Sequence, residues 1–222
     1  MKFVCSLAFV ATLVAATPAL AQEVETDRLR DAPLRRYVAA VVGAASIGTE
    51  RVPTIAAEFG ESITRNSQAY VTLSYFDNVM TDRMRDNLLA AAETIRLVTG
   101  TSRTFSGRDR ALAFTAGGKY VAGTTVRPYV GAGAGAINIT RTITEVSLGD
   151  VTQAFAEQTG FGDGVVSAGS TEATKPLAEV VAGVGFVTRN MVVDVGYRYR
   201  RAFHTATTLD FSQVAVGIGA KW

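Results

Sequence analysis

Six charged residues occupy alternating positions in segments of the sequence that have the pattern of β-strands. Because successive side chains of a strand point to opposite faces, all six would face the interior if these strands closed into a barrel. A buried charge is tolerated when it is paired, so three acids and three bases favour a salt-bridged plug; the alternative is a path for protons or ions. The predicted lumenal charges are Glu58, Lys119, Glu179, Asp194, Arg198 and Arg200.

Motifs for metal, nucleotide or nucleophilic chemistry are not found in the sequence. The chain has one histidine and one cysteine, and it contains no Gly-x-Ser-x-Gly motif and no phosphate-binding loop. The Gly-x-Gly-x-Gly run at 131–135 falls inside a predicted strand, where glycine suits a crowded lumen. We therefore expect no cofactor, no metal and no catalytic residue.

Eight predicted strands position the six charges. The last strand shows the pattern most clearly, because Val214, Val216 and Ile218 alternate with small or polar residues up to Trp222. Such a strand, apolar on one face and ending in an indole ring, is typical of a strand that faces lipid. Near Ala136 the alternation slips, which predicts a bulge. The predicted strands are Tyr37–Ile47, Thr54–Thr64, Gln68–Phe76, Ala111–Ala122, Arg127–Thr140, Leu177–Thr188, Met191–Phe203 and Leu209–Trp222.

The connections between these strands differ in length in a regular way. They are brief around 65–67, 123–125 and 189–190, and long at 77–110 and 141–176. Short periplasmic turns opposite long extracellular loops are the pattern of outer-membrane barrels, and an even number of strands leaves both termini periplasmic. Apolar spacing predicts a helix over Thr81–Val98 in the first long loop, and a shorter helix over Asp150–Glu157 in the second.

The N-terminus predicts secretion. Lys2, an apolar run and the small residues Ala19 and Ala21 indicate a signal peptide at 1–21, followed by a periplasmic segment at 22–36 and a barrel at 37–222. Cys5 would be lost with the signal, which excludes disulfides. The formal net charge of +2 gives no basic excess that would suggest nucleic acid.

The glycine- and aromatic-rich hairpins carry a family resemblance. The segments 117–120 and 127–135, the hairpin 183–199 and Trp222 resemble the small outer-membrane β-barrel family that includes opacity-type proteins and the outer-membrane protein A and X barrels. The resemblance implies an eight-stranded antiparallel up-and-down barrel inserted from the periplasm, with barrel-assembly machinery and periplasmic chaperones as partners during insertion.

We therefore predict an all-β transmembrane barrel in the bacterial outer membrane, in contact with lipid and lipopolysaccharide. A soluble β-sandwich or lipocalin-like barrel is disfavoured, because it would hide its apolar face and expose its charges. Aromatic residues near strand ends are assigned to the membrane interfaces. These are Tyr37, Tyr75, Tyr120, Tyr197, Tyr199 and Trp222.

The predicted role is structural or surface-interacting, through the two long loops, in a monomer without enzymatic activity. One alternative is a narrow porin for small solutes. A second is a lipid-modifying enzyme around His204, because a histidine near a hydroxyl resembles the outer-membrane lipid A deacylases. Those enzymes rely on a His-x-Ser pair, whereas this chain has Thr205, Ala206 and Thr207 after the histidine.

The hairpin at Arg189 and Asn190 allows a prediction of register. If these two residues form the turn, paired residue numbers keep one sum along both strands. Glu179 would then face Arg200 inside the lumen, where opposite charges partly offset the cost of their desolvation.

Overall fold

The computed structural model describes residues 36–146, 148–154, 171–203 and 208–222. The predicted signal peptide at 1–21 and the predicted periplasmic segment lie outside these residues, except for Arg36. Among the described residues, no helix has the length and apolar character needed to cross a membrane.

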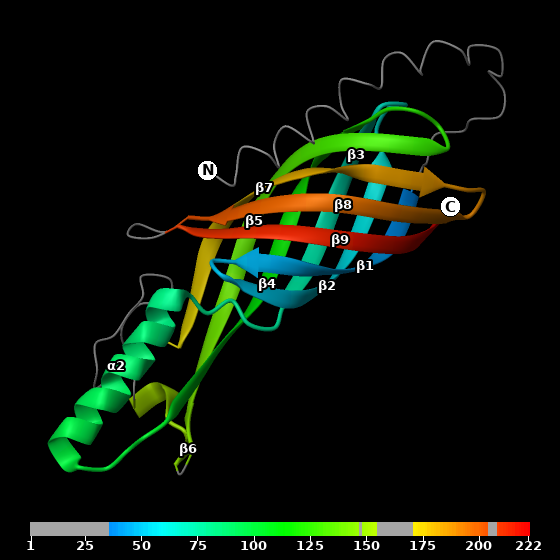
Figure 1. The fold of residues 1–222 in the computed structure, drawn as a ribbon. Helices are drawn as coiled ribbons and strands as arrows, with labels where there is room; N and C mark the ends of the chain where they lie inside the picture. The colour runs from blue at the N-terminus through cyan, green and yellow to red at the C-terminus, as the bar shows by residue number, and fades with distance from the viewer. Residues whose placement is uncertain (1–35, 147, 155–170, 204–207) are drawn as a thin grey trace, which may run out of the picture.

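The described chain forms a closed antiparallel β-barrel of eight long strands (Figure 1). Neighbours in the sheet follow the order β4-β3-β2-β1-β9-β8-β7-β5, and pairing of β4 with β5 closes the barrel. The two-residue β6 pairs only with the end of β5. The elements are β1 (Arg36–Ile47), β2 (Glu50–Ser62), β3 (Ser67–Phe76), α2 (Asp82–Thr99), β4 (Phe105–Val121), β5 (Val126–Glu145), β6 (Gly149–Asp150), β7 (Glu172–Val187), β8 (Met191–Ala202) and β9 (Leu209–Lys221).

The outer wall of the barrel is apolar and the interior holds most of its buried polar groups. On β9, Val214, Val216 and Ile218 are exposed, whereas the alternating Phe211 and Gln213 are buried. Exposed valine, leucine, isoleucine and phenylalanine recur on the outer face of the other barrel strands as well. This distribution is the reverse of that of a water-soluble barrel and matches a wall that faces lipid.

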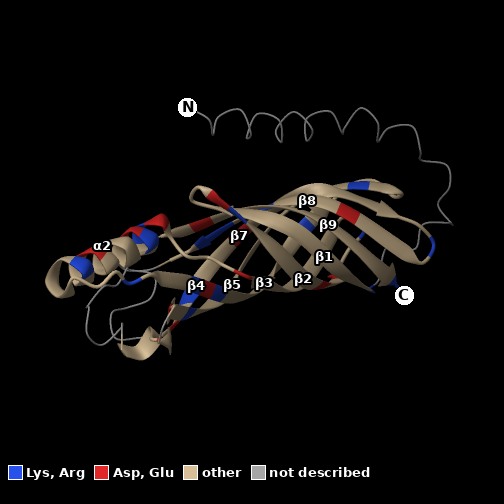
Figure 2. Cartoon of the chain, turned by 60° about the horizontal axis from the view of Figure 1, so that its bottom comes forward, with Lys and Arg blue, Asp and Glu red and all other residues tan. Residues whose placement is uncertain are grey.

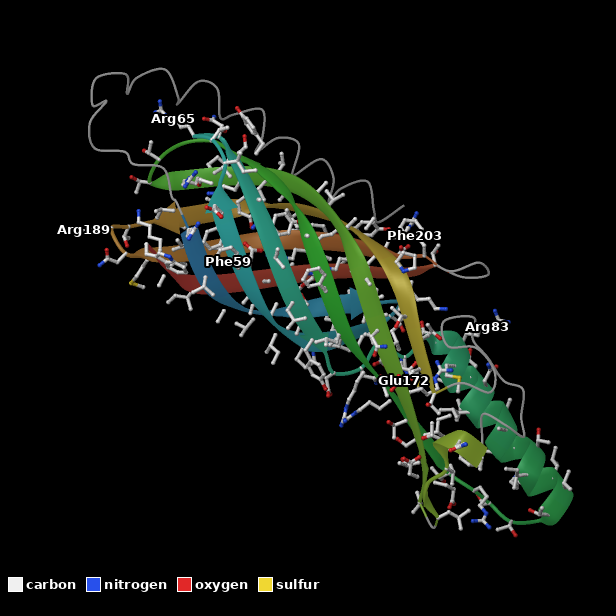
Figure 3. The ribbon with its side chains drawn as sticks, turned by 180° about the vertical axis from the view of Figure 1, so that it is seen from behind. Phe59, Arg65, Arg83, Glu172, Arg189 and Phe203 are labelled. Carbon is white, nitrogen blue, oxygen red and sulfur yellow. The ribbon has the colours of Figure 1, made fainter. Side chains whose placement is uncertain are left out.

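The two ends of the barrel differ. At one end, which we call the turn end, the connections 63–66, 122–125 and 188–190 are short, and Arg36 and Trp222 exchange backbone hydrogen bonds of 3.3 and 3.1 Å. Figure 3 shows Arg65 and Arg189 at this end. At the opposite end, the helix end, lie α2 and the extended tips of β4 and β5. The connections that follow β3 and β5 are long at this end, whereas only Gly48 and Thr49 join β1 to β2 there.

Strand boundaries depart from the prediction at the helix end. β2 begins at Glu50 instead of Thr54, after a tight turn in which Gly48 has a φ of 58°. β4 and β5 continue to Phe105 and Glu145, beyond the predicted limits. Their pairing keeps one register along its whole length, so the bulge predicted near Ala136 is absent.

The extension of β4 and β5 forms a two-stranded ribbon outside the barrel. Its residues Phe105–Arg110 have no partner on β3, whose pairing with β4 stops at Phe76 and Ala111. At about 3.3 Å per residue, six residues carry the ribbon roughly 20 Å past the rim. Figure 2 shows Lys, Arg, Asp and Glu segments along α2 and the neighbouring strand ends, beside a largely uncharged barrel wall.

The helix α2 lies within one residue of its predicted limits. Thr81 caps its N-terminus by accepting a 3.2 Å hydrogen bond from the Met84 amide, and Gly100 ends it in the left-handed conformation with a φ of 71°. Of the second predicted helix, over 150–157, residues 152–154 are helical and the last three lie outside the described residues. The first turn of α2 is held to the rim, because Thr49 donates a 3.1 Å hydrogen bond to Asp82.

One face of α2 packs on the ribbon. Met80, Met84, Leu88 and Ala91 form a buried cluster with Ile143 of β5. The close approach depends on a glycine: a Cβ atom at Gly107 would stand 2.8 Å from Leu88 Cδ1 and closer still to Met80 Cε. Apolar packing against a glycine therefore fixes the helix to the ribbon.

We predict that Gly107→Phe detaches α2 from the ribbon and leaves the barrel folded. The new ring occupies the space that Met80 and Leu88 fill. Protease cleavage within 77–104 should become at least tenfold faster, whereas the heat-dependent gel shift of the closed barrel should persist. Ser106→Phe, on the exposed face of the same strand, is the matched control. Equal cleavage of the two variants would contradict this packing.

Candidate functional site

Glu58 on β2 stands at the centre of the buried charges in the barrel. Its carboxylate accepts hydrogen bonds of 2.5 Å from Lys119 Nζ and 2.5 Å from the Tyr37 hydroxyl, and one of 3.3 Å from Thr72. Arg198 Nη2 also pairs with it. Both ionised partners of Glu58 are buried with it, so the negative charge is balanced inside the lumen without solvent.

A second carboxylate, Glu179 on β7, organises the next layer toward the helix end. Arg200 Nε pairs with it, as the predicted register requires, and Arg198 Nη1 lies 3.8 Å away. The hydroxyls of Tyr70 and Thr115 donate hydrogen bonds of 2.8 and 3.3 Å, both to Oε1 of Glu179. Arg198 therefore contacts both carboxylates and joins the two layers into one network.

The network reaches strands that carry none of the ions. Arg200 Nη1 donates a 2.9 Å hydrogen bond to Gln213 of β9, whose amide donates one of 2.7 Å to Thr54 of β2. Arg200 Nη2 donates another, of 3.1 Å, to Ser74 of β3. With the contacts above, buried polar side chains connect strands on every side of the barrel. A satisfied network of this kind stiffens the structure, since each member fixes its neighbours.

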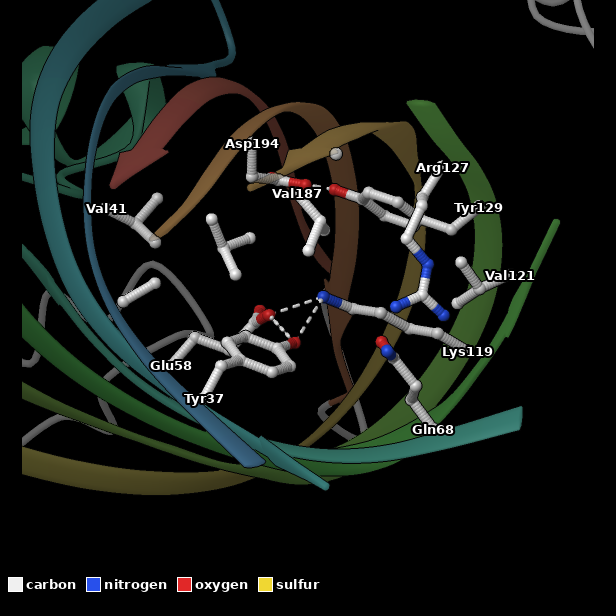
Figure 4. Close-up of a pocket in the computed structure, with 13 residues that line it drawn as sticks. Tyr37, Val41, Glu58, Gln68, Lys119, Val121, Arg127, Tyr129, Val187 and Asp194 are labelled. Carbon is white, nitrogen blue, oxygen red and sulfur yellow. Dashed lines mark hydrogen bonds and ion pairs between the residues drawn. The ribbon is translucent and has the colours of Figure 1, made fainter. Parts of the chain in front are cut away.

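Aromatic rings complete the charged layer near the turn end (Figure 4). Lys119 Nζ lies 4.8 and 4.7 Å from the ring centres of Tyr70 and Tyr129, within the range of cation–π attraction. The Tyr129 hydroxyl donates a 2.9 Å hydrogen bond to Asp194. The structure thus brings all six predicted lumenal charges into one interior region, five of them buried and Asp194 half-buried.

An apolar cluster fills the lumen between this network and the helix end. Phe76 and Phe211 stack at 5.3 Å between ring centres, and Ile137 and Ile139 are fully buried beside them. The side chains of this cluster are all apolar, so none of them needs a water-filled space for hydrogen bonding. An interior blocked by hydrocarbon gives hydrated ions no favourable route.

The predicted interface aromatics divide into three groups. Tyr37 is misassigned: it is 5% exposed and binds Glu58 in the lumen, because its strand parity places it with Ala39 inside. Tyr120 and Trp222 are exposed at the turn end, and Tyr75 and Tyr199 lie near the helix-end rim on the outer face. Tyr197 lies in the middle of β8, where its hydroxyl donates a 2.9 Å hydrogen bond to Ser212.

Sequence reasoning missed two buried groups. Asp109 and Arg141 form a two-pronged ion pair of 2.9 and 2.7 Å at the base of the ribbon, where the predicted strands had already ended. Arg127 is buried at the turn end, and no described residue forms a hydrogen bond with its Nε. The sequence did contain a signal for this position: Arg127 lies two residues before Tyr129 on β5, so the two side chains share the inward face. The predicted enzymatic alternative around His204 lies outside the described residues, which contain no cluster of ligands suited to a metal ion.

We predict that Glu179→Ala lowers the free energy of unfolding by about 3–5 kcal/mol, because it leaves the buried Arg200 without its counter-charge. The double variant with Arg200→Ala should recover part of this loss. Urea unfolding of the refolded barrel measures both values. Asp210→Ala removes the partner of the exposed Arg201 and is the control, with a much smaller expected loss because solvent screens this ion pair. Additive losses at 179 and 200 would show that the two side chains are not coupled.

Comparisons with known proteins support the fold. No protein-family model and no curated protein matches the chain. Among solved structures, Neisserial surface protein A is similar, with 17% sequence identity, a TM-score of 0.53 and coverage of 84% of this chain and 96% of that chain. The attachment invasion locus protein Ail of Yersinia pestis gives 12% identity and a TM-score of 0.47, over 84% and 96% of the two chains.

The N-terminal β-barrel domain of Pseudomonas aeruginosa OprF gives 14% identity and a TM-score of 0.43, over 83% and 98% of the two chains. At these identities the likeness concerns architecture alone. The chain has the fold of the small eight-stranded outer-membrane β-barrels, as its resemblance to the opacity-type proteins predicted.

Proposed function

We propose that this chain is an outer-membrane surface protein without catalytic activity, whose barrel anchors a rigid platform for contacts with a protein partner outside the cell. The platform comprises residues 77–110, 141–146 and 148–154, that is, α2, the projecting ribbon and β6. In the proposed orientation the turn end faces the periplasm and the platform faces the exterior, as is usual where short turns and long loops lie on opposite sides.

The platform is built as an ordered unit. The Asp109–Arg141 ion pair is buried at its base, and Asn78 Oδ1 accepts hydrogen bonds of 3.2 and 3.1 Å from the amides of Met80 and Asp109. An ion pair between Arg85 and Glu50 adds a link from the helix to the rim. Preorganisation of this kind lowers the entropy lost on binding, which supports a role in recognition.

The observation that carries the proposal is the exposed apolar surface at the far end of the platform. Leu97 and Val98 at the end of α2 are 70% and 79% exposed, and Val146 and Leu148 at the tip of the ribbon are 83% and 66% exposed. Figure 1 shows that the end of α2 and the tip of the ribbon lie away from the barrel. Because these side chains are remote from the apolar wall, lipid cannot cover them. Apolar surface exposed to water in this way is typical of protein-contact sites.

We predict that the refolded chain does not conduct ions in planar bilayers, because Phe76, Phe211 and the neighbouring isoleucines fill the lumen. The narrow porin, the alternative function, requires conductance. Single-channel recording at 1 M salt separates the two. Regular conductance steps from heat-modifiable protein would contradict the proposed role of the barrel as an anchor.

The platform is tested by attachment of cells that display the chain. The double variant Leu97→Glu and Val98→Glu should reduce attachment to neighbouring cells and to protein-coated surfaces at least threefold, with unchanged surface abundance. Ala90→Glu and Thr94→Glu add the same charge to exposed positions of α2 and form the matched control. Equal attachment by the two double variants would contradict a contact role for the distal apolar residues.

A further inference from the structure

A small cavity lies inside the barrel at the turn end, below the Glu58 layer. Its volume is about 40 Å³, and its wall is formed by residues of seven strands, β1 to β5, β7 and β8. Figure 4 shows Arg127 and Lys119 projecting into it from one side and Asp194 from the other. The lining includes Tyr37, Glu58, Gln68, Lys119, Arg127 and Asp194.

The charge network and the cavity wall together contain one more cation than carboxylates. Of the four cations, three are paired: Lys119 and Arg198 with Glu58, and Arg200 with Glu179. The third carboxylate, Asp194, accepts its hydrogen bond from Tyr129. The fourth cation has no ion pair among the described residues. Four cations less three carboxylates leave a charge of +1 (4 − 3).

That fourth cation is Arg127. The residue is 6% exposed, and its Nε–H has no hydrogen-bond partner among the described residues. A buried guanidinium is costly when no carboxylate pairs with it, and none of the described carboxylates pairs with Arg127. Tyr70 and Tyr129, whose rings contact Lys119, donate their hydroxyl hydrogen bonds to Glu179 and Asp194 respectively. The site therefore offers a free positive charge and a free donor to whatever enters the cavity.

We infer that the cavity binds a small monocarboxylate that enters from the turn end. A planar carboxylate matches the side-on edge of a guanidinium, where Nε–H and the neighbouring Nη–H donate two parallel hydrogen bonds. The single excess charge suits a monoanion. Glu58 and Asp194 in the opposite wall disfavour a dianion such as phosphate, and the small volume excludes bulky acids. In the proposed orientation the ligand comes from the periplasm.

Acetate is the probe for this inference. The refolded chain without residues 1–21 is titrated with sodium acetate by calorimetry, with sodium chloride exchanged to keep the ionic strength constant. We expect saturable binding with a stoichiometry of one, and an increase in the temperature of heat unfolding. Arg127→Gln should weaken acetate binding at least tenfold. Arg65→Gln, which removes an exposed charge at the same end of the barrel, should leave it unchanged.

A second variant keeps the charge of Arg127 and reduces the volume of the cavity. A Cβ atom at Gly185 would lie 3.7 Å from the Arg127 carbonyl oxygen and 3.8 Å from Asp194 Oδ2, which is ordinary contact. Gly185→Ala should therefore fold normally and narrow the cavity. Its affinity for acetate should fall severalfold although Arg127 is intact.

The unliganded variants separate binding from structure. Because Arg127 Nε has no partner in the described part of the chain, Arg127→Gln should fold and unfold at the same temperature as the parent chain, or higher, when acetate is absent. Failure of Arg127→Gln to fold would assign it a structural role and overturn the inference. Undiminished acetate binding by both variants would also overturn it. So would the absence of a heat signal when acetate replaces chloride, because chloride would then bind equally well.

Discussion

Eight strands enclose a space that their own inward side chains fill, and the interior of this protein follows from that constraint. A polar atom placed there must find its partner there or remain unsatisfied, as Arg127 Nε does among the described residues. Arg198 meets the requirement by contacting two carboxylates that belong to different strands. The charged layer and the apolar layer above it are separate: polar groups gather where they satisfy one another, and hydrocarbon fills the rest.

The same constraint explains which parts of the interior could be predicted from the sequence. Where a strand alternates strongly, as β7 and β8 do, a two-residue turn sets the register, and Glu179 faces Arg200 as predicted. β1 offers no such contrast, because Val38 and Val42 outside alternate with Ala39 and Val41 inside. Its parity could not be assigned from polarity, and Tyr37 was consequently placed on the wrong face.

Alternation is informative only where lipid lies on one side. The ribbon projects beyond the rim, so Arg108 and Arg110 occupy outer positions that would be apolar in the membrane, and the sequence no longer marks the strand. Around Ala136 the residues are too small to show which face they occupy, which made a regular strand resemble a bulged one. That no described carboxylate pairs with Arg127 depends on distances among several strands and has no signature in the spacing of residues.

The seam between β1 and β9 carries a consequence for how the molecule is made. These strands pair from Tyr37 with Lys221 to Ser46 with Ser212, although they lie at opposite ends of the described chain, and backbone hydrogen bonds join Arg36 to Trp222. Contacts of such large sequence separation are slow to form. Until they do, the sheet has two unsatisfied edges, each able to recruit a foreign strand. The chain is therefore most exposed to misassociation in the interval before its first and last strands meet, and a helper that shields one edge would act at that step.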